Sequence, residues 1–300
     1  MTQSSRRARA LSSAVASAIA VALTAVGAGA ARADAPVPAG PADRVAGTGV
    51  AAGQHKPTAT APLFFLSGML PSGQMYVYLP DGKGGFDDRS GAYVWPHLKY
   101  GVSIDPDLTG YQDGEYHVMD DGTVNLWRGG HVKKMATGWG RYNAVFSPGT
   151  LSGAKHPDLL ARDKQGVLWR VPTKAGGSLS ARVEVGTGWD RYSQITGQGD
   201  LTGDREPDVV ARDKRGVLWL YKGTGDARKP FASRVRVGSG WNRYDKLVAT
   251  GDVDADGHSD LLARDPQGKL WLLKGTGRAA AFFKPRVTIG TGFNQYRALF

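Results

Sequence analysis

The sequence predicts an all-β protein: a five-bladed β-propeller made of four-stranded repeats, each about 48 residues long. A first motif recurs every 52 residues, beginning at Val183 (VEVGTGWDRY), Val235 (VRVGSGWNRY) and Val287 (VTIGTGFNQY). Within each unit, apolar segments such as DLLARD and KLWLLKG are separated by a short Gly turn, which is typical of a β-hairpin. The content of 42 Gly, 11 Tyr and 8 Trp favours short strands with tight turns over long helices.

The number of repeats follows from two markers that each occur about five times. The aromatic residue of the VEVGTGWDRY-type marker stands at Trp95, Trp139, Trp189, Trp241 and Phe293. The second marker, ARDKQGVLW, ends at Trp169, Trp219 and Trp271, with weaker copies at Tyr76 and Trp127. The segment LFFLSG corresponds to DLLARD, and the final YRALF corresponds to the strand before it. One blade built from both termini would therefore close the ring without an exposed strand edge. An open array, or a larger ring completed by a second chain, is the alternative.

Three regions are expected along the chain. Residues 1–33 combine an Arg-containing start, an Ala/Val-rich run and the small residues of a cleavage site, so they predict a signal peptide cleaved after Ala33. A membrane anchor is the alternative, and the export route stays open. Residues 34–61 are rich in Pro, Ala and Gly and indicate a flexible linker. Residues 63–300 hold the repeats. We therefore expect a secreted protein, extracellular or associated with the cell wall.

Composition limits the possible chemistry and partners. The absence of Cys excludes disulfides, thiolate metal sites and Cys nucleophiles. Cleavage after Ala33 would remove four Arg and leave 34 basic and 27 acidic residues, a charge of about +7. The basic residues are scattered, which argues against nucleic acid and is compatible with anionic wall polymers. No catalytic motif occurs, so we expect a binding protein without enzyme activity; a secreted hydrolase is the less favoured alternative. We expect a monomer with no membrane span after cleavage.

The strongest chemical signal is an Asp-rich loop between two expected strands, and it recurs. Carboxylates at positions 1, 3, 5 and 9, with Gly at position 6, suit the hard oxygen ligands of Ca²⁺. In an alternative interpretation, these side chains only brace turns by accepting backbone hydrogen bonds. The corresponding residues 150–158 keep only Asp158 and are expected to bind no metal. The candidate Ca²⁺ residues are Asp252, Asp254, Asp256, His258 (through its carbonyl) and Asp260; Asp200, Thr202, Asp204, Glu206 and Asp208; and Asp105, Asp107, Thr109 and Asp113.

These Asp loops, followed by DLLARD-type strands, resemble the FG-GAP/VCBS repeats of integrin-like β-propellers, in the style of secreted actinobacterial proteins. The resemblance covers residues 63–300 and is most specific at 200–220 and 252–272. It implies Ca²⁺ at the Asp loops. The repeat number and the Gly-Trp-x-x-Tyr motif also resemble tachylectin-type five-bladed lectins, which lack these Asp loops.

The ligand is not encoded as directly as the fold. Trp139, Trp189 and Trp241 each follow a Gly and could present a ring face to a sugar, although the same rings would also suit packing between blades. We expect an extracellular binding module for cell-wall or environmental glycans. A protein-interaction module, such as an inhibitor or accessory of a secreted enzyme, is the alternative.

Overall fold

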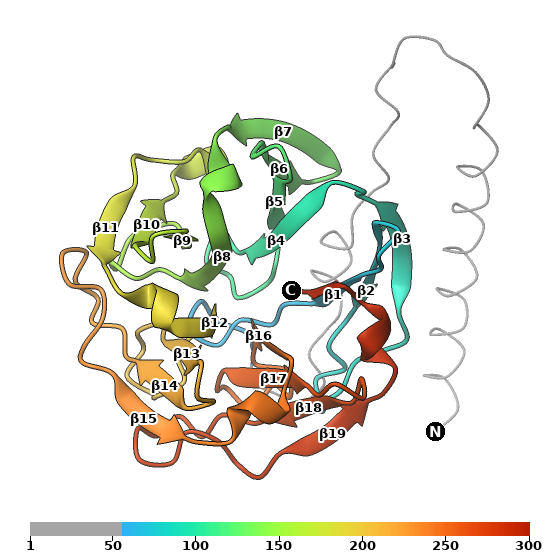
Figure 1. The fold of residues 1–300 in the computed structure, drawn as a ribbon, viewed down its shortest axis with the longest axis vertical. Coiled ribbons are helices and arrows are strands. Elements are labelled where there is room, and N and C mark those ends of the chain that lie inside the picture. The colour runs from blue at the N-terminus through green and yellow to red at the C-terminus, as the bar shows by residue number, and fades with distance from the viewer. Residues whose placement is uncertain (1–55) are drawn as a thin grey trace. The chain divides into compact units, whose positions relative to one another are not determined.

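The computed structural model describes residues 56–300, which form five four-stranded antiparallel sheets around a common centre (Figure 1). The predicted all-β, five-bladed propeller is confirmed. From the inner to the outer strand, blade 1 contains β20 (Ala298–Leu299), β1 (Leu66–Met69), β2 (Gln74–Tyr78) and β3 (Ser90–Val94), and blade 2 contains β4 (Leu98–Ile104), β5 (Gly114–Met119), β6 (Val124–Arg128) and β7 (His131–Ala136).

The other three blades repeat this order. Blade 3 contains β8 (Tyr142–Gly149), β9 (Asp158–Asp163), β10 (Leu168–Pro172) and β11 (Val183–Gly186). Blade 4 contains β12 (Tyr192–Thr196), β13 (Val209–Asp213), β14 (Leu218–Tyr221) and β15 (Val235–Gly238). Blade 5 contains β16 (Lys246–Gly251), β17 (Asp260–Arg264), β18 (Leu270–Leu273) and β19 (Val287–Gly290). Short 3₁₀ turns are η1 (Trp139–Arg141), η2 (Ala175–Gly177), η3 (Trp189–Arg191), η4 (Trp241–Arg243) and η5 (Phe293–Gln295).

Blade 1 closes the ring with strands from both ends of the repeat region. β20 pairs with β1 in antiparallel register, with Gly68 opposite Leu299 and Met69 opposite Ala298. Because this pairing covers the edge of β1, the expected closure is confirmed.

The predicted signal peptide (1–33) and residues 34–55 of the predicted linker lie outside the described residues. The last part of that linker packs against the propeller: the carbonyl of Thr60 accepts a hydrogen bond from Asp200, and the carbonyl of Pro62 accepts one from Asp252. Ala61 is 5% exposed. The packed part of the chain therefore starts before Leu63. The carbonyls of Thr60 and Pro62 satisfy backbone N–H groups of two Asp loops, which would otherwise lack an acceptor. No helix among residues 56–300 is long and apolar enough to cross a membrane.

One repeat marker was aligned incorrectly in the sequence. Trp169 pairs with Ala161 in the β9–β10 hairpin, and the residue in the matching position of the β5–β6 hairpin is Asn125, which pairs with His117. Trp127 lies two residues further along and is buried. The similar letters DGTVNLW and KQGVLW concealed this offset, which only the strand register reveals.

The core lies at the junctions between neighbouring blades. Leu160 and Leu168 of blade 3, for example, pack with Val209 and Ala211 of blade 4. All four are fully buried, and burying a side chain as large as Leu is worth roughly 1.5–3 kcal/mol. The rigid junctions fix the positions of the loops at both ends of the inner strands.

Candidate functional site

The Asp loop 252–260 connects β16 to β17 and brings three carboxylates together. Oxygens of Asp252, Asp254 and Asp260 all lie within 4.8 Å of one another. Asp252 accepts hydrogen bonds from the backbone of Asp256 and Gly257, at 3.0 and 2.7 Å. One oxygen of Asp254 is buried without a hydrogen-bond partner among the described residues. The loop therefore holds an acidic cluster with an unused acceptor.

This cluster is electrostatically unfavourable without a cation. Burial raises the pKa of Asp252 to about 7 and the pKa of Asp260 to about 8. Lys274 contacts Asp254 at 2.8 Å, and Lys284 contacts Asp256 at 2.9 Å. With all four carboxylates ionised, these two lysines leave two negative charges. That balance suits a divalent cation with oxygen ligands.

One of the predicted carboxylate ligands, Asp256, lies outside the cluster. Asp256 forms its ion pair with Lys284 and does not join the other three carboxylates. The backbone N–H of His258 donates to Asp256 at 3.1 Å, so this part of the loop is held by a turn. The spacing could not separate ligands from turn residues, because both arrangements use Asp at alternate positions.

Loop 105–113, between β4 and β5, forms a second cluster from Asp105, Asp107 and Asp113. Asp113 forms an ion pair with Arg128, and its other oxygen is buried without a partner among the described residues. Burial raises the pKa of Asp105 to about 7. Thr109 is used locally: its hydroxyl accepts a hydrogen bond from the backbone of Tyr111 at 3.4 Å.

Loop 200–208, between β12 and β13, is organised differently. Asp200 accepts backbone hydrogen bonds from Thr202, Gly203 and Arg205. Burial raises the pKa of Asp208 to about 7, and Asp204 pairs with Lys222 at 2.9 Å. The carboxylates of this loop, Glu206 included, are not among the groups of three that converge within 4.8 Å in residues 56–300.

Loop 150–158 carries a built-in cation in place of the missing acids. Asp158 is fully buried, and Arg170 of β10 contacts it at 2.9 Å. Arg170 also donates to Ser152 at 3.2 Å. One carboxylate and one guanidinium are thus balanced in this loop.

The predicted ligand-binding tryptophans lie inside the blade junctions. Trp139 is 7% exposed and Trp189 is 6% exposed, while Trp241 is half-buried. Gly138, Gly188 and Gly240, which precede them, have φ between 75° and 79°. This left-handed conformation favours Gly and turns each ring inward. Each ring then packs against the Tyr three residues later, with centroids 5.2–5.7 Å apart. These rings therefore contribute to packing between blades, and those of Trp139 and Trp189 are largely covered.

An arginine series that the sequence analysis missed lies beside these rings. The guanidinium groups of Arg182, Arg234 and Arg286 lie 3.9–4.1 Å above Trp169, Trp219 and Trp271. Arg89 lies 4.3 Å above Tyr76 in the same way. Each guanidinium also donates to a Tyr hydroxyl of its own blade: Tyr142, Tyr192, Tyr244 and Tyr296. The signal in the sequence was a basic residue just before the outer strand of four repeats.

Hollows accompany this series at two blade junctions. One of about 360 Å³ is lined by Trp139, Tyr142 and Arg182, and one of about 390 Å³ by Tyr78, Arg89 and Gln295. The four arginines are exposed, so their remaining N–H groups face solvent. An aromatic ring with a fixed guanidinium can bind hydroxyl-rich or acidic groups.

A buried acid–base pair lies at the junction of blades 1 and 2. Nε2 of His117 is 3.0 Å from Oε1 of Glu115, and both side chains are 3% exposed. Trp95 packs edge-on against His117 at 4.3 Å. The pair is enclosed by the core, which separates it from the solvent-facing hollows.

Comparison with known protein families identifies one repeat region in this chain. The model of the FG-GAP-like repeat matches residues 200–263. No curated relative matches the chain. The fold is similar to that of the BP39L lectin from Burkholderia pseudomallei, with 15% identity over 75% of this chain and 69% of that chain and a TM-score of 0.48. It is also similar to that of AofleA from Arthrobotrys oligospora, with 12% identity over 82% of this chain and 75% of that chain and a TM-score of 0.45. Residues 56–300 are thus a five-bladed β-propeller that contains an FG-GAP-like repeat region at residues 200–263.

Proposed function

We propose that this protein is a secreted, calcium-binding propeller that acts as an extracellular binding module for cell-wall or environmental glycans. The observation that carries the binding role is the repeated pairing of an exposed arginine with an aromatic ring in four of the five blades. Repetition matters because several weak sites on one rigid ring bind a polymer with much higher avidity than one site.

Calcium has a structural role in this proposal. Asp252, Asp254 and Asp260 would hold one ion, and Asp105, Asp107 and Asp113 a second, because these groups converge and keep unused acceptor oxygens. Ca²⁺ supplies the charge that the buried carboxylates lack. Loop 200–208 remains a predicted third site.

The glycan proposal is tested by retention of the purified protein on insoluble polysaccharides, in Ca²⁺ and at low salt. We expect Arg234→Met to weaken retention about tenfold or more, because it removes a charged donor worth about 1.5–3 kcal/mol. Arg228→Met is the matched control, since Arg228 is an exposed arginine of the same blade, whereas the guanidinium stacked on Trp219 belongs to Arg234. An equal loss of retention in both variants would show that retention depends only on the net charge of the protein.

Two outcomes would redirect the proposal. Retention that is unchanged in Arg234→Met and in a variant lacking all four stacked arginines would move the glycan site elsewhere. Capture of one secreted protein that soluble glycans do not compete away would favour the protein-interaction alternative.

A further inference from the structure

The centre of the propeller contains a polar cavity that the glycan and calcium proposals do not use. It has a volume of about 100 Å³ and is lined by all five inner strands, with Phe64 below them. The hydroxyls of Ser103 and Thr250 line it and are buried without a hydrogen-bond partner among residues 56–300. The cavity therefore offers unused donors.

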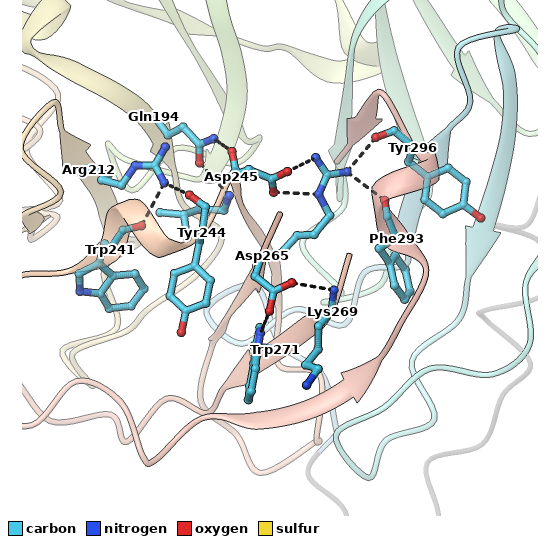
Figure 2. Close-up of polar contacts among 12 residues, drawn as sticks. Gln194, Arg212, Trp241, Tyr244, Asp245, Asp265, Lys269, Trp271, Phe293 and Tyr296 are labelled. Atoms are coloured by element: carbon cyan, nitrogen blue, oxygen red, sulfur yellow. Dashed lines mark hydrogen bonds and ion pairs between the residues drawn. The ribbon is translucent and has the colours of Figure 1, made fainter. Parts of the chain in front are cut away.

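Five cations, one from each blade, form a ring at the end of the propeller where the inner strands begin. Each side chain donates to a backbone carbonyl at the start of the next blade: Lys99 to Tyr142, Arg162 to Tyr192, Arg212 to Tyr244, Arg264 to Tyr296 and Arg297 to Leu98. Figure 2 shows this arrangement at Arg212, whose guanidinium reaches the carbonyls of Trp241 and Tyr244. The carbonyl oxygens accept hydrogen bonds from these five side chains, but they carry no net charge and therefore do not neutralise the positive charges.

Carboxylates neutralise this ring only in part. Asp245 forms a two-pronged ion pair with Arg264, at 2.9 Å for each contact. Among the described residues, the other four cations have no ion-pair partner. The Asp loops lie at the opposite ends of the inner strands, so one mouth is basic and the other is acidic.

Lys246 adds a sixth cation inside the ring. It is the first residue of β16, lines the cavity and is half-buried. Within residues 56–300 its ammonium has neither a hydrogen-bond acceptor nor an ion-pair partner. Burial and the neighbouring Arg264 lower the pKa of Lys246 to about 8, which expresses the cost of holding this charge alone. An anion at the mouth would remove that cost.

We propose that the basic mouth of the central channel is a binding site for a small oxyanion, in which Lys246 donates to the ligand and the five-cation ring supplies the attractive field. The ligand class is a carboxylate, sulfate or phosphate group, whose several acceptor oxygens match an ammonium. The size of the cavity restricts the site to one such group. It is separate from the stacked arginines at the outer junctions.

The test is calorimetric titration of the full protein with sodium sulfate and, in a second arm, sodium acetate, against sodium chloride at equal ionic strength. We expect sulfate or acetate to bind at one site where chloride does not, and the two arms distinguish an inorganic from a carboxylate ligand. Lys246→Met is expected to weaken binding about tenfold or more, because it removes one charge-assisted donor. Lys246→Arg is expected to retain binding.

Lys164→Met is the control, because Lys164 is exposed in a turn of blade 3, outside the ring. Binding that is equal for sulfate, acetate and chloride would overturn the proposal, and so would unchanged affinity in Lys246→Met. If Lys246→Met does not fold, Lys246→Gln and the comparison of anions with the unmodified protein decide the question. Loss of glycan retention in the arginine variants would not alter this result, so the two proposals fail separately.

Discussion

Loops 252–260 of blade 5 and 150–158 of blade 3 occupy the same position in their repeats, but their buried carboxylates are placed in different electrostatic surroundings. Asp260 and Asp158 are equivalent, almost fully buried, and each accepts a hydrogen bond from the backbone of the second loop residue at 2.9 Å. In loop 150–158, Arg170 supplies a fixed positive charge. In loop 252–260 the equivalent of Arg170 is Leu272, and extra carboxylates take the place of neutral side chains.

A buried carboxylate that stays ionised in this fold requires a compensating positive charge, which can come from a fixed side chain such as Arg170 or from a dissociable ion. Arg170 is part of the chain and always charged, so the stability of loop 150–158 should not depend on divalent ions or pH in the solution. Loop 252–260 should depend on divalent ions and on pH. The comparison therefore gives opposite expectations for two loops of nearly identical backbone.

The largest effect is expected from removing the built-in cation. Arg170→Met leaves Asp158 buried without its partner, which typically costs about 3–5 kcal/mol. We expect the melting temperature to fall by roughly 2–4 °C per kcal/mol and Ca²⁺ not to restore it. Asp158→Asn combined with Arg170→Met should recover much of the loss, because the amide keeps the loop hydrogen bond without the charge. Restoration of Arg170→Met by Ca²⁺ would instead show that the two loops are interchangeable.

The next prediction concerns loop 252–260, from which a chelator would remove Ca²⁺. At a Ca²⁺ concentration 100 times the dissociation constant, one bound ion stabilises the fold by about 2.7 kcal/mol, which a chelator would remove. Asp254→Asn should abolish most of this difference, because it removes a carboxylate whose second oxygen has no partner in the metal-free loop; it also breaks the ion pair with Lys274, as Asp256→Asn breaks the one with Lys284. Asp256→Asn is the matched control, since Asp256 pairs with Lys284 outside the cluster. Differential scanning calorimetry with metal analysis measures both; equal loss in the two variants would contradict the assignment of ligands.

The third prediction is the pH dependence of the metal-free protein. Unfolded Asp titrates near 3.9, whereas the folded pKa of Asp252 is about 7 and that of Asp260 about 8. Because the folded pKa values are raised, the folded state holds these protons more firmly, and this stability is lost as pH rises from about 4 to about 8. We expect the metal-free melting temperature to fall between pH 5 and pH 8, and the benefit of Ca²⁺ to grow over the same range. A constant gap between the two melting curves would show that protons and Ca²⁺ do not share these carboxylates.

Much of the fold could be predicted because it repeats. The 52-residue spacing, the hairpin pattern and the matching ends of the chain identified five blades and their closure, and the Asp spacing located the acidic loops. Each strand pattern occurs in several repeats, so a strand that is ambiguous in one repeat can be assigned from its clearer copies in the others. Where one repeat departs from the others, as at Trp127, the same reasoning placed the residue two positions away from its structural equivalent.

The sequence by itself determined the blade number, the strand content and which loops carry excess acid, because these depend on residues close together in the chain. Only the tertiary structure decided that Trp139 and Trp189 are buried, that Arg170 neutralises Asp158, and that six cations from five blades lie at the end where the inner strands begin. Each of these depends on which side chains from different strands or blades come into contact. Burial and electrostatic balance arise from those contacts, and spacing along the chain does not encode them directly.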